Sequence, residues 1–299
     1  MTEQKPLTIK DLNTENPRWC AGCGDFGIIM GMKRFMVEEQ IQPHQTVNIS
    51  GIGCSGRAPF YFNTYGVHAI HGRAVPVALG LALTRPDLNL FIHSGDGDAI
   101  SIGGNHLIHG INKNFNCVFI MYDNEIYALT KNQTSPTTPQ GHVTNTQPGG
   151  TFLEPIYPMK FVIGAGVSFA ASTADWMPKH LTATLKAAFA HKGFSFVHVA
   201  QRCPHFFPDN YDSKSTDWFS FLTHEEGIPA DPRLADKVEV ITHDPTDKEE
   251  AFKFSASNRH YFGLFYRNPD KMRYDAVLQQ GVQDAPRRSR KHLLDNFKI

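Results

Sequence analysis

Four cysteines stand in sequence contexts that are typical of metal ligands. Cys20 and Cys23 form a Cys-x-x-Cys motif, whereas Cys54 lies in Gly-Ile-Gly-Cys-Ser-Gly and Cys203 in Gln-Arg-Cys-Pro-His. Four cysteine thiolates are the usual ligands of an iron–sulfur cluster, and ferredoxins also have a proline after a ligating cysteine. A zinc site commonly combines two compact Cys-x-x-Cys units, and this chain has one. The spacing therefore favours a cluster, with zinc and a thiol redox pair as the alternatives.

An aspartate and an asparagine offer oxygen ligands for a second site. Asp96 lies in Gly-Asp-Gly-Asp, residues 95–98, and Asn124 follows the next apolar run. Mg²⁺ prefers oxygen ligands in near-octahedral geometry, which a backbone carbonyl near Ile126 would extend. The glycines permit close approach of the backbone to a diphosphate. The pattern predicts a magnesium diphosphate site, and the alternative is a simple turn at a strand end.

The order of elements around these residues predicts that they meet. Leu88–His93 and Cys117–Tyr122 are short apolar runs typical of buried strands, and Ser101–Asn112 between them is expected to be a helix. Strand, helix and strand in this order form a βαβ unit with parallel strands. Asp96 and Asn124 then lie past the carboxyl ends of neighbouring strands, where open α/β sheets bind ligands.

The alternation of predicted strands and helices continues through most of the chain. We expect helices over Asp25–Phe35 and His71–Leu83 and a strand over Thr46–Ser50. Residues 130–151 are rich in polar residues, proline and glycine, and are expected to form a long loop. Helices over 157–165 and 176–191 and strands over 167–171 and 194–200 complete the pattern.

The predicted fold class is α/β, with a doubly wound, mostly parallel sheet in residues 1–209. Residues 210–299 are more polar and weaker in pattern, and are expected to form a C-terminal extension packed on the main domain. The chain has 299 residues, of which 41% are hydrophobic, so it can bury a substantial core. The fifth cysteine, Cys117, stands in an apolar strand and is expected in that core.

Charge and hydropathy exclude several classes of protein. Lys and Arg together number 29, as do Asp and Glu, so no basic excess indicates nucleic-acid binding. The first residues resemble no secretory signal, and no apolar stretch approaches the ~20 residues of a membrane span. We therefore expect a soluble, cytoplasmic protein in which cysteines bind metal or do chemistry rather than form disulfides.

Five motifs in order resemble the β subunit of the 2-oxoacid:ferredoxin oxidoreductases. They read WCAGCGDFG, GIGCSG, HGRAVPVALGLAL, GDGDAISIGGNH and YDNEIYALTKNQTSPTT. The resemblance is dense over residues 17–210 and loose at 263–267. It implies thiamine diphosphate with Mg²⁺, a [4Fe-4S] cluster, and oxidative decarboxylation of a 2-oxoacid. Coenzyme A takes the acyl group, ferredoxin takes the electrons, and the reverse reductive carboxylation is also open to the family.

The resemblance also implies roles for individual residues. Residues 1–209 become the domain that binds thiamine diphosphate and the cluster. The four cysteines become cluster ligands, and Asp96, Asn124 and the Ile126 backbone become magnesium ligands. The cofactor's near neighbours are then Gly53, Ser55, His71, Gly95, Gly97, Asp98 and Tyr127. For His71 the alternative is a capping or core histidine.

The choice of substrate depends on two cations. Arg57 follows a cluster cysteine by three residues, and Lys131 lies on the predicted loop. Together with His71 they are the expected substrate contacts, because two cations suit the two carboxylates of 2-oxoglutarate. The Thr-Lys-Asn-Gln segment is similar to the 2-oxoglutarate-using branch of the family. The alternatives are two solvated charges and a pyruvate-specific enzyme.

A glutamate that activates the aminopyrimidine ring is expected in thiamine enzymes, on a second domain of similar size. Nothing past residue 210 has the length or pattern of that domain. We therefore expect an α subunit that supplies the glutamate and most of the coenzyme A site, in a heterodimer assembled as (αβ)₂. The competing readings are a non-oxidative thiamine-dependent decarboxylase half-site and an iron–sulfur electron-transfer or assembly subunit without thiamine.

Overall fold

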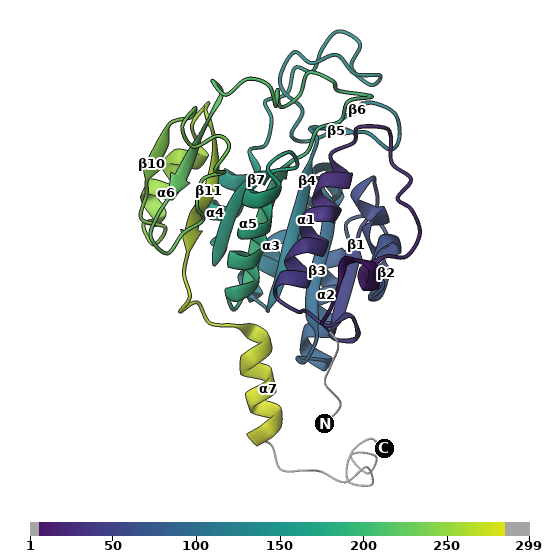
Figure 1. The fold of residues 1–299 in the computed structure, drawn as a ribbon, viewed down its shortest axis with the longest axis vertical. Helices are drawn as coiled ribbons and strands as arrows, with labels where there is room; N and C mark the ends of the chain where they lie inside the picture. Colours follow the sequence, from purple (N-terminus) through teal and green to yellow (C-terminus); the bar gives the residue numbers. More distant parts are fainter. Residues whose placement is uncertain (1–5, 285–299) are drawn as a thin grey trace, which may run out of the picture.

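A nine-stranded sheet forms the centre of the computed structural model, which describes residues 6–284 (Figure 1). Its strand order is β10-β9-β11-β7-β8-β4-β3-β1-β2, and every neighbouring pair is parallel except β11 with β7. The strands are β1 (Thr46–Ser50), β2 (Tyr65–His68), β3 (Asn89–Gly95), β4 (Cys117–Asp123), β7 (Phe169–Ala174), β8 (Phe194–Ala200), β9 (Phe219–Thr223), β10 (Val240–Thr242) and β11 (His260–Arg267). The predicted α/β class with a mostly parallel sheet is confirmed.

Helices cover both faces of the sheet. One face carries α1 (Asp25–Glu38) and α5 (Pro178–Ala190), and the other carries α2 (Ala74–Thr84), α3 (Gly104–Lys113) and α4 (Pro158–Gly164). The remaining helices are α6 (Lys248–Ser255), α7 (Tyr274–Asp284), the 3-10 helices Ile9–Leu12, Pro43–Gln45 and Ser55–Tyr61, and the π-helix Gly97–Ile102. None of the helices in residues 6–284 is both long and apolar enough to span a membrane.

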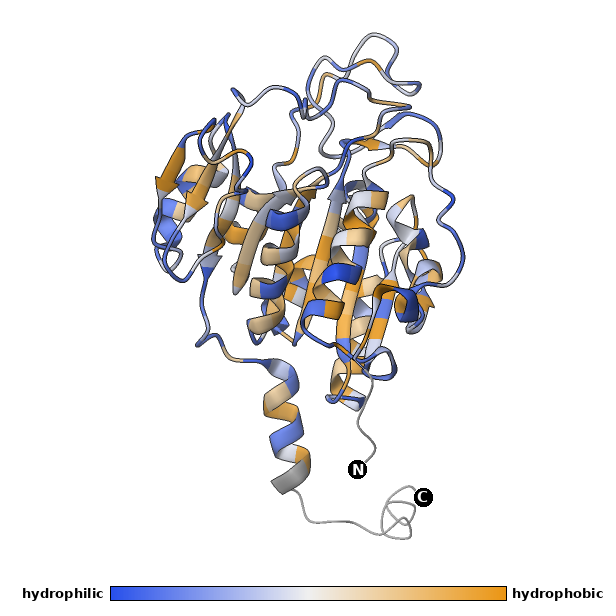
Figure 2. Ribbon diagram, viewed as in Figure 1, coloured by the Kyte–Doolittle hydropathy of each residue, from blue (hydrophilic) through white to orange (hydrophobic). Residues whose placement is uncertain are grey.

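Side chains of β4 alternate between the two layers of the core. Phe119 and Met121 join Cys117 against α2 and α3, whereas Val118 and Ile120 face the layer of α1 and α5. Burying each large apolar side chain contributes about 1.5–3 kcal/mol. The buried apolar strands at the centre of Figure 2 therefore hold the sheet together and fix the positions of the loops that follow them. The prediction that Cys117 is a core residue is confirmed.

Two helices begin later than the sequence pattern predicts. The helix expected from His71 begins at Ala74, because Gly72 has φ +69 and makes a turn that excludes helix. The helix expected from Ser101 begins at Gly104, after the π-helix Gly97–Ile102 that directly follows Asp96. His71 therefore lies in a turn before its helix, whereas Gly97 and Asp98 lie within the π-helix at the sheet edge.

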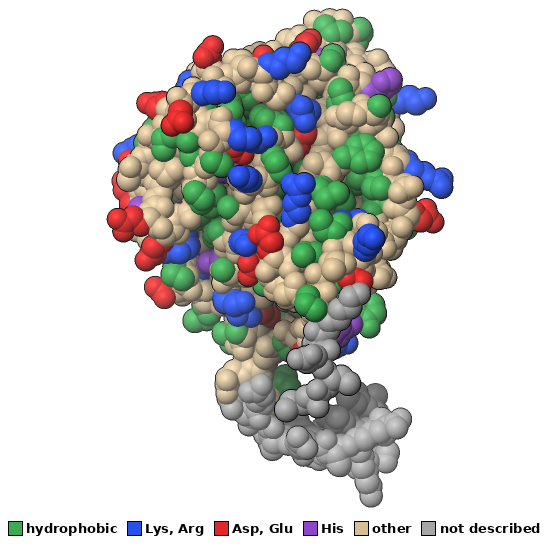
Figure 3. All heavy atoms as spheres, viewed as in Figure 1, with side chains coloured by type: hydrophobic (Ala, Val, Ile, Leu, Met, Phe, Trp, Pro, Cys, Tyr) green, Lys and Arg blue, Asp and Glu red, His purple; other side chains and the backbone are tan. Residues whose placement is uncertain are grey.

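The segment after residue 209 contributes strands to the same sheet. Parallel strands β9, β10 and β11 extend it beyond β7, and α6 packs beside them. The domain division at residue 209 stays a prediction, but the sheet itself continues across it. The predicted loop at 130–151 contains a two-residue strand, β6 (Gln133–Thr134), which pairs with β5 (Ile126–Tyr127). On the face in Figure 3, basic side chains are interspersed with acidic and apolar ones.

Candidate functional site

A pocket of about 110 Å³ lies past the carboxyl ends of β1, β3 and β4. Every residue predicted to lie near the cofactor lines this pocket: Gly53, Ser55, His71, Gly95, Asp96, Gly97, Asp98, Asn124, Ile126 and Tyr127. They come from four separate loops, which the parallel strands bring to one edge of the sheet. The structure thus brings together residues of four separate motifs, while their individual roles stay predictions.

Asp98 ties three of these loops together. Its carboxylate accepts hydrogen bonds from the Ile52 N–H at 3.1 Å, the Gly72 N–H at 2.8 Å and the Ser94 hydroxyl at 2.5 Å. His71 Nδ1 also lies 2.6 Å from Asp98 Oδ1, although the ring is not aligned for a hydrogen bond. With its oxygens engaged by the protein, Asp98 positions the loops around the pocket.

Asp96 shares a hydroxyl group with a second buried carboxyl. Thr137 Oγ1 lies 2.8 Å from Asp96 Oδ2 and 2.9 Å from Asp123 Oδ1. The hydroxyl has a single proton, so Asp96 and Asp123 compete for the same donor. Burial and then the neighbouring Asp123 raise the pKa of Asp96 to about 7. A cation beside Asp96 would relieve this repulsion.

Replacing Thr137 by valine is expected to destabilise this edge of the sheet. Valine has the same shape but removes the hydroxyl that both buried carboxyls contact, at a cost of about 1–3 kcal/mol. The cofactor-free protein should then melt a few degrees lower than the wild type in a thermal unfolding measurement. Thr137→Ser keeps the hydroxyl and should melt close to the wild type, and equal melting of both variants would contradict the assignment.

Besides His71 Nδ1, three buried polar groups of residues that line the pocket have no hydrogen-bond partner. They are both oxygens of the Asp25 carboxyl, the Ser55 hydroxyl and the Gln201 Oε1 atom. Buried polar atoms without partners are uncommon in native proteins and point to a bound polar group. Burial and then Asp175 raise the pKa of Asp25 to about 7. The sequence analysis did not single out Asp25, although it directly follows the Cys-x-x-Cys-Gly segment.

The four predicted cluster cysteines line one neighbouring pocket of about 180 Å³. Backbone and side-chain contacts hold their loops together. Trp19 Nε1 donates to the Cys54 carbonyl at 2.9 Å, and the Gly24 N–H donates to the Arg202 carbonyl at 3.1 Å. Gln201, Cys54 and Asn124 line this pocket and the first one, so the two pockets share a wall.

Burial governs the acidity of the thiols. It is the largest cause of the raised pKa of Cys54, at about 12, and it also raises the pKa of Cys23 and of Cys203 above the usual thiol value. Binding of a metal centre here would therefore displace protons from these thiols. Within residues 6–284, no three His, Cys, Asp or Glu side chains are grouped closely enough to hold a single metal ion.

Arg57 and Lys131 line the cysteine pocket rather than the cofactor pocket. Arg57 donates to the Arg18 carbonyl at 2.7 Å, and Arg18 itself lines the same pocket. Lys131 is exposed and has φ +75, a backbone conformation that residues other than glycine adopt rarely. The two predicted substrate contacts thus lie across the shared wall from His71, and their role stays a prediction.

A third cavity, of about 260 Å³, lies on the other side of Asp123. Its wall includes Glu125, whose pKa is raised well above the usual value by burial and by Asp123. His198 Nε2 contacts Asp123 Oδ2 at 3.0 Å, and Ser172 contacts the other ring nitrogen at 2.9 Å. No sequence motif marks this network, because its members come from three different strands.

Comparisons with known proteins identify the family to which the chain is similar. The model of the thiamine pyrophosphate enzyme C-terminal TPP binding domain matches residues 51–199. The chain is 43% identical over 213 residues to 2-oxoglutarate oxidoreductase subunit KorB of Mycobacterium tuberculosis, a match that covers 71% of this chain and 57% of that protein. It is 34% identical over 268 residues to the β subunit of 2-oxoacid:ferredoxin oxidoreductase 1 of Aeropyrum pernix, covering 88% and 81%.

A solved structure resembles the whole chain. The 2-oxoglutarate:ferredoxin oxidoreductase from Magnetococcus marinus, with 2-oxoglutarate, coenzyme A and succinyl-CoA bound, superposes with a TM-score of 0.86. Sequence identity in this match is 31%, and it covers 100% of this chain and 98% of that chain. The likeness of the fold therefore includes the strands after residue 209.

Proposed function

Because the chain belongs to the β subunits of the 2-oxoacid:ferredoxin oxidoreductases, we propose that it carries thiamine diphosphate with Mg²⁺ and a [4Fe-4S] cluster in adjacent pockets. The proposed reaction converts 2-oxoglutarate and coenzyme A to succinyl-CoA and CO₂. Two electrons leave, one at a time, for ferredoxin, and the reaction also runs in reverse as reductive carboxylation. The observation that carries the proposal is the wall shared by the two pockets.

The first pocket fits a magnesium diphosphate. Asp96 and Asn124 would hold the ion through side-chain oxygens and Ile126 through its backbone carbonyl. The buried, unpartnered groups of Ser55 and Asp25 suit a polar cofactor. When bound, thiamine diphosphate supplies the electron sink for decarboxylation. The chain's own contribution is to hold the cofactor at the sheet edge, through loops fixed by Asp98.

The second pocket suits a cluster better than zinc. A structural zinc site commonly combines two compact Cys-x-x-Cys units, whereas here Cys54 and Cys203 stand singly in separate segments. A cluster of several irons spreads its four thiolates farther apart. Among the residues that line the pocket, Arg18, Arg57 and Lys131 are cationic and none is acidic, which suits a centre of net negative charge.

A glutamate for the aminopyrimidine ring is proposed to come from an α subunit. The lining of the cofactor pocket includes three aspartates, Asp25, Asp96 and Asp98, and no glutamate among the residues that the structure describes. Glu125 lines the cavity behind Asp123 instead. We therefore propose a cytoplasmic (αβ)₂ complex in which the partner completes the site and supplies most of the coenzyme A contacts.

The choice of 2-oxoglutarate is tested by removing the two cations. Arg57→Ala and Lys131→Ala are each expected to raise KM for 2-oxoglutarate by roughly tenfold or more, because each removes a charge-assisted contact to a carboxylate. Steady-state kinetics of the purified complex, with pyruvate as the comparison substrate, measure the effect. Lys253→Ala, an exposed lysine on α6, serves as the control. Wild-type kinetics in both variants would contradict the proposed substrate contacts.

The visible spectrum of the anaerobically co-purified complex tests the function as a whole. We expect a brown absorbance band that bleaches when 2-oxoglutarate and then coenzyme A are added. Bleaching with pyruvate alone would keep the enzyme class and replace the substrate. A colourless complex, after cluster loss during handling has been excluded by iron analysis, would instead favour a non-oxidative thiamine-dependent decarboxylase.

A further inference from the structure

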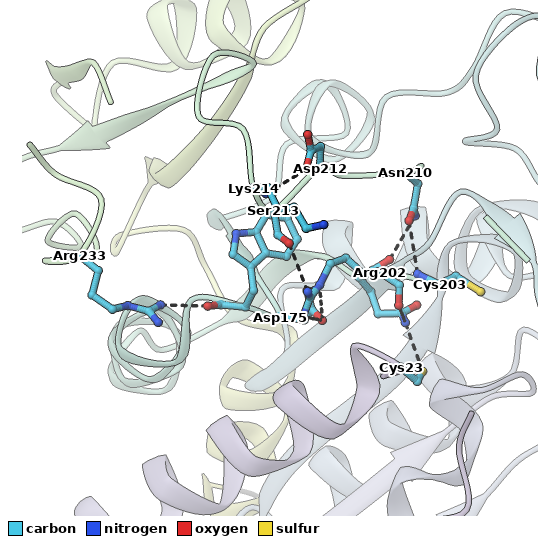
Figure 4. Close-up of polar contacts among 11 residues, drawn as sticks. Cys23, Asp175, Arg202, Cys203, Asn210, Asp212, Ser213, Lys214 and Arg233 are labelled. Carbon is cyan, nitrogen blue, oxygen red and sulfur yellow. Dashed lines mark hydrogen bonds and ion pairs between the residues drawn. The ribbon is translucent and has the colours of Figure 1, made fainter. Parts of the chain in front are cut away.

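We propose that Asn210 is a positioning residue that couples the cofactor loop to the cysteine loop. The inference rests on the proposed function of both pockets. It adds a residue that lies outside the five motifs quoted above. Asn210 lies seven residues after Cys203 and is 4% exposed. Figure 4 shows its side chain directed toward the backbone beside Cys203, at the end of β8.

The amide of Asn210 uses both ends at once. Its oxygen accepts a hydrogen bond from the Cys203 N–H at 3.3 Å. Its NH₂ group donates to the Asn124 carbonyl at 3.1 Å and to the Gln201 carbonyl at 3.3 Å. One acceptor and two donors match the amide inventory of asparagine, whereas aspartate lacks both donors and leucine lacks all three. The side chain thereby joins the backbone of a proposed magnesium ligand to that of a proposed cluster ligand.

Further contacts hold in place the segment that contains Cys203, at the end of β8. Gln201 Nε2 lies 3.5 Å from Cys23 Sγ, and the Gln201 N–H donates to the Asp123 carbonyl at 2.9 Å. The Arg202 guanidinium pairs with the buried Asp175 carboxylate at 3.0 Å, as Figure 4 also shows. With the end of β8 held on both sides, movement of the Asn124 loop is transmitted through Asn210 to Cys203.

A connection of this kind has a thermodynamic consequence. If a filled cofactor pocket fixes the Asn124 loop, it also holds Cys203 in the geometry that keeps the cluster. Linkage requires the reverse effect to be equal, so an intact cluster must strengthen cofactor binding by the same factor. A residue that only supported the fold would weaken both sites without changing this mutual effect.

The test measures cluster loss and cofactor affinity in the purified complex. In the wild type, thiamine diphosphate with Mg²⁺ is expected to slow the loss of brown absorbance in air by about 5-fold or more. In Asn210→Asp the protection should fall to nearly none. The dissociation constant of thiamine diphosphate should likewise differ between cluster-loaded and cluster-free complex in the wild type, and not in the variant. Asn258→Asp, an exposed asparagine, should behave as the wild type.

Other outcomes separate this inference from the proposed function. Full protection in Asn210→Asp, or no protection in the wild type, would overturn the coupling and leave the two cofactors in place. A wild-type complex with no brown band would overturn both. If Asn210→Asp does not accumulate as folded protein, Asn210→Ser, which is too short to span both loops, takes its place and must show the same loss of protection.

Discussion

Asp96→Asn is expected to raise the dissociation constant of thiamine diphosphate at fixed Mg²⁺ by roughly 100-fold or more. Loss of a group that merely orients a metal ligand typically costs 10–100-fold in affinity, so loss of a charged ligand should cost at least as much. Asparagine keeps the shape of the side chain and can still contact Thr137, so the substitution removes mainly the negative charge. Calorimetric titration of the complex with the cofactor measures the change.

A matched control separates the metal role from a general charge effect. Asp87→Asn makes the same chemical change at an exposed carboxylate paired with Arg85, and cofactor binding should be unaltered. The brown absorbance of Asp96→Asn should remain, because the cysteines lie in the neighbouring pocket. Wild-type cofactor affinity in Asp96→Asn would contradict its assignment as a magnesium ligand.

The residues of the cofactor pocket could be predicted from the sequence because the signals that mark them lie within short segments. Glycines beside Asp96, an asparagine after the next apolar run and the strand–helix–strand order are all readable within a few residues. Parallel strands then bring their carboxyl ends to one edge, so the order of elements suffices to predict which loops meet. All the residues expected near the cofactor accordingly line one pocket.

The residues that sequence reasoning missed act across distant parts of the chain. Thr137 contacts Asp96 from 41 positions away, and Asn210 contacts Asn124 from 86 positions away. Neither distance leaves a periodic or spacing signal, because only the tertiary fold sets it. Arg57 and Lys131, the predicted substrate contacts, line the cysteine pocket, and their contact with the substrate stays a prediction. The three strands after residue 209 were missed because the segment is more polar and weaker in pattern, and β10 has only three residues.

Cys203→Ser is expected to lower the iron content of the complex to roughly a tenth of the wild-type value and to remove the brown absorbance, because a serine hydroxyl is a much poorer ligand than a thiolate. Cys117→Ser is the matched control: it places the same change at a buried cysteine in the core of β4, away from the pocket. That variant should lose some stability and keep its iron, since Cys117 packs against apolar side chains. Iron and sulfide analysis of both variants, purified without air, distinguishes the roles. An iron content equal to that of the wild type in Cys203→Ser would show that the fourth cluster ligand is not Cys203. In that case Asn210 would not connect the cofactor loop to a cluster ligand, and the proposed coupling would fail.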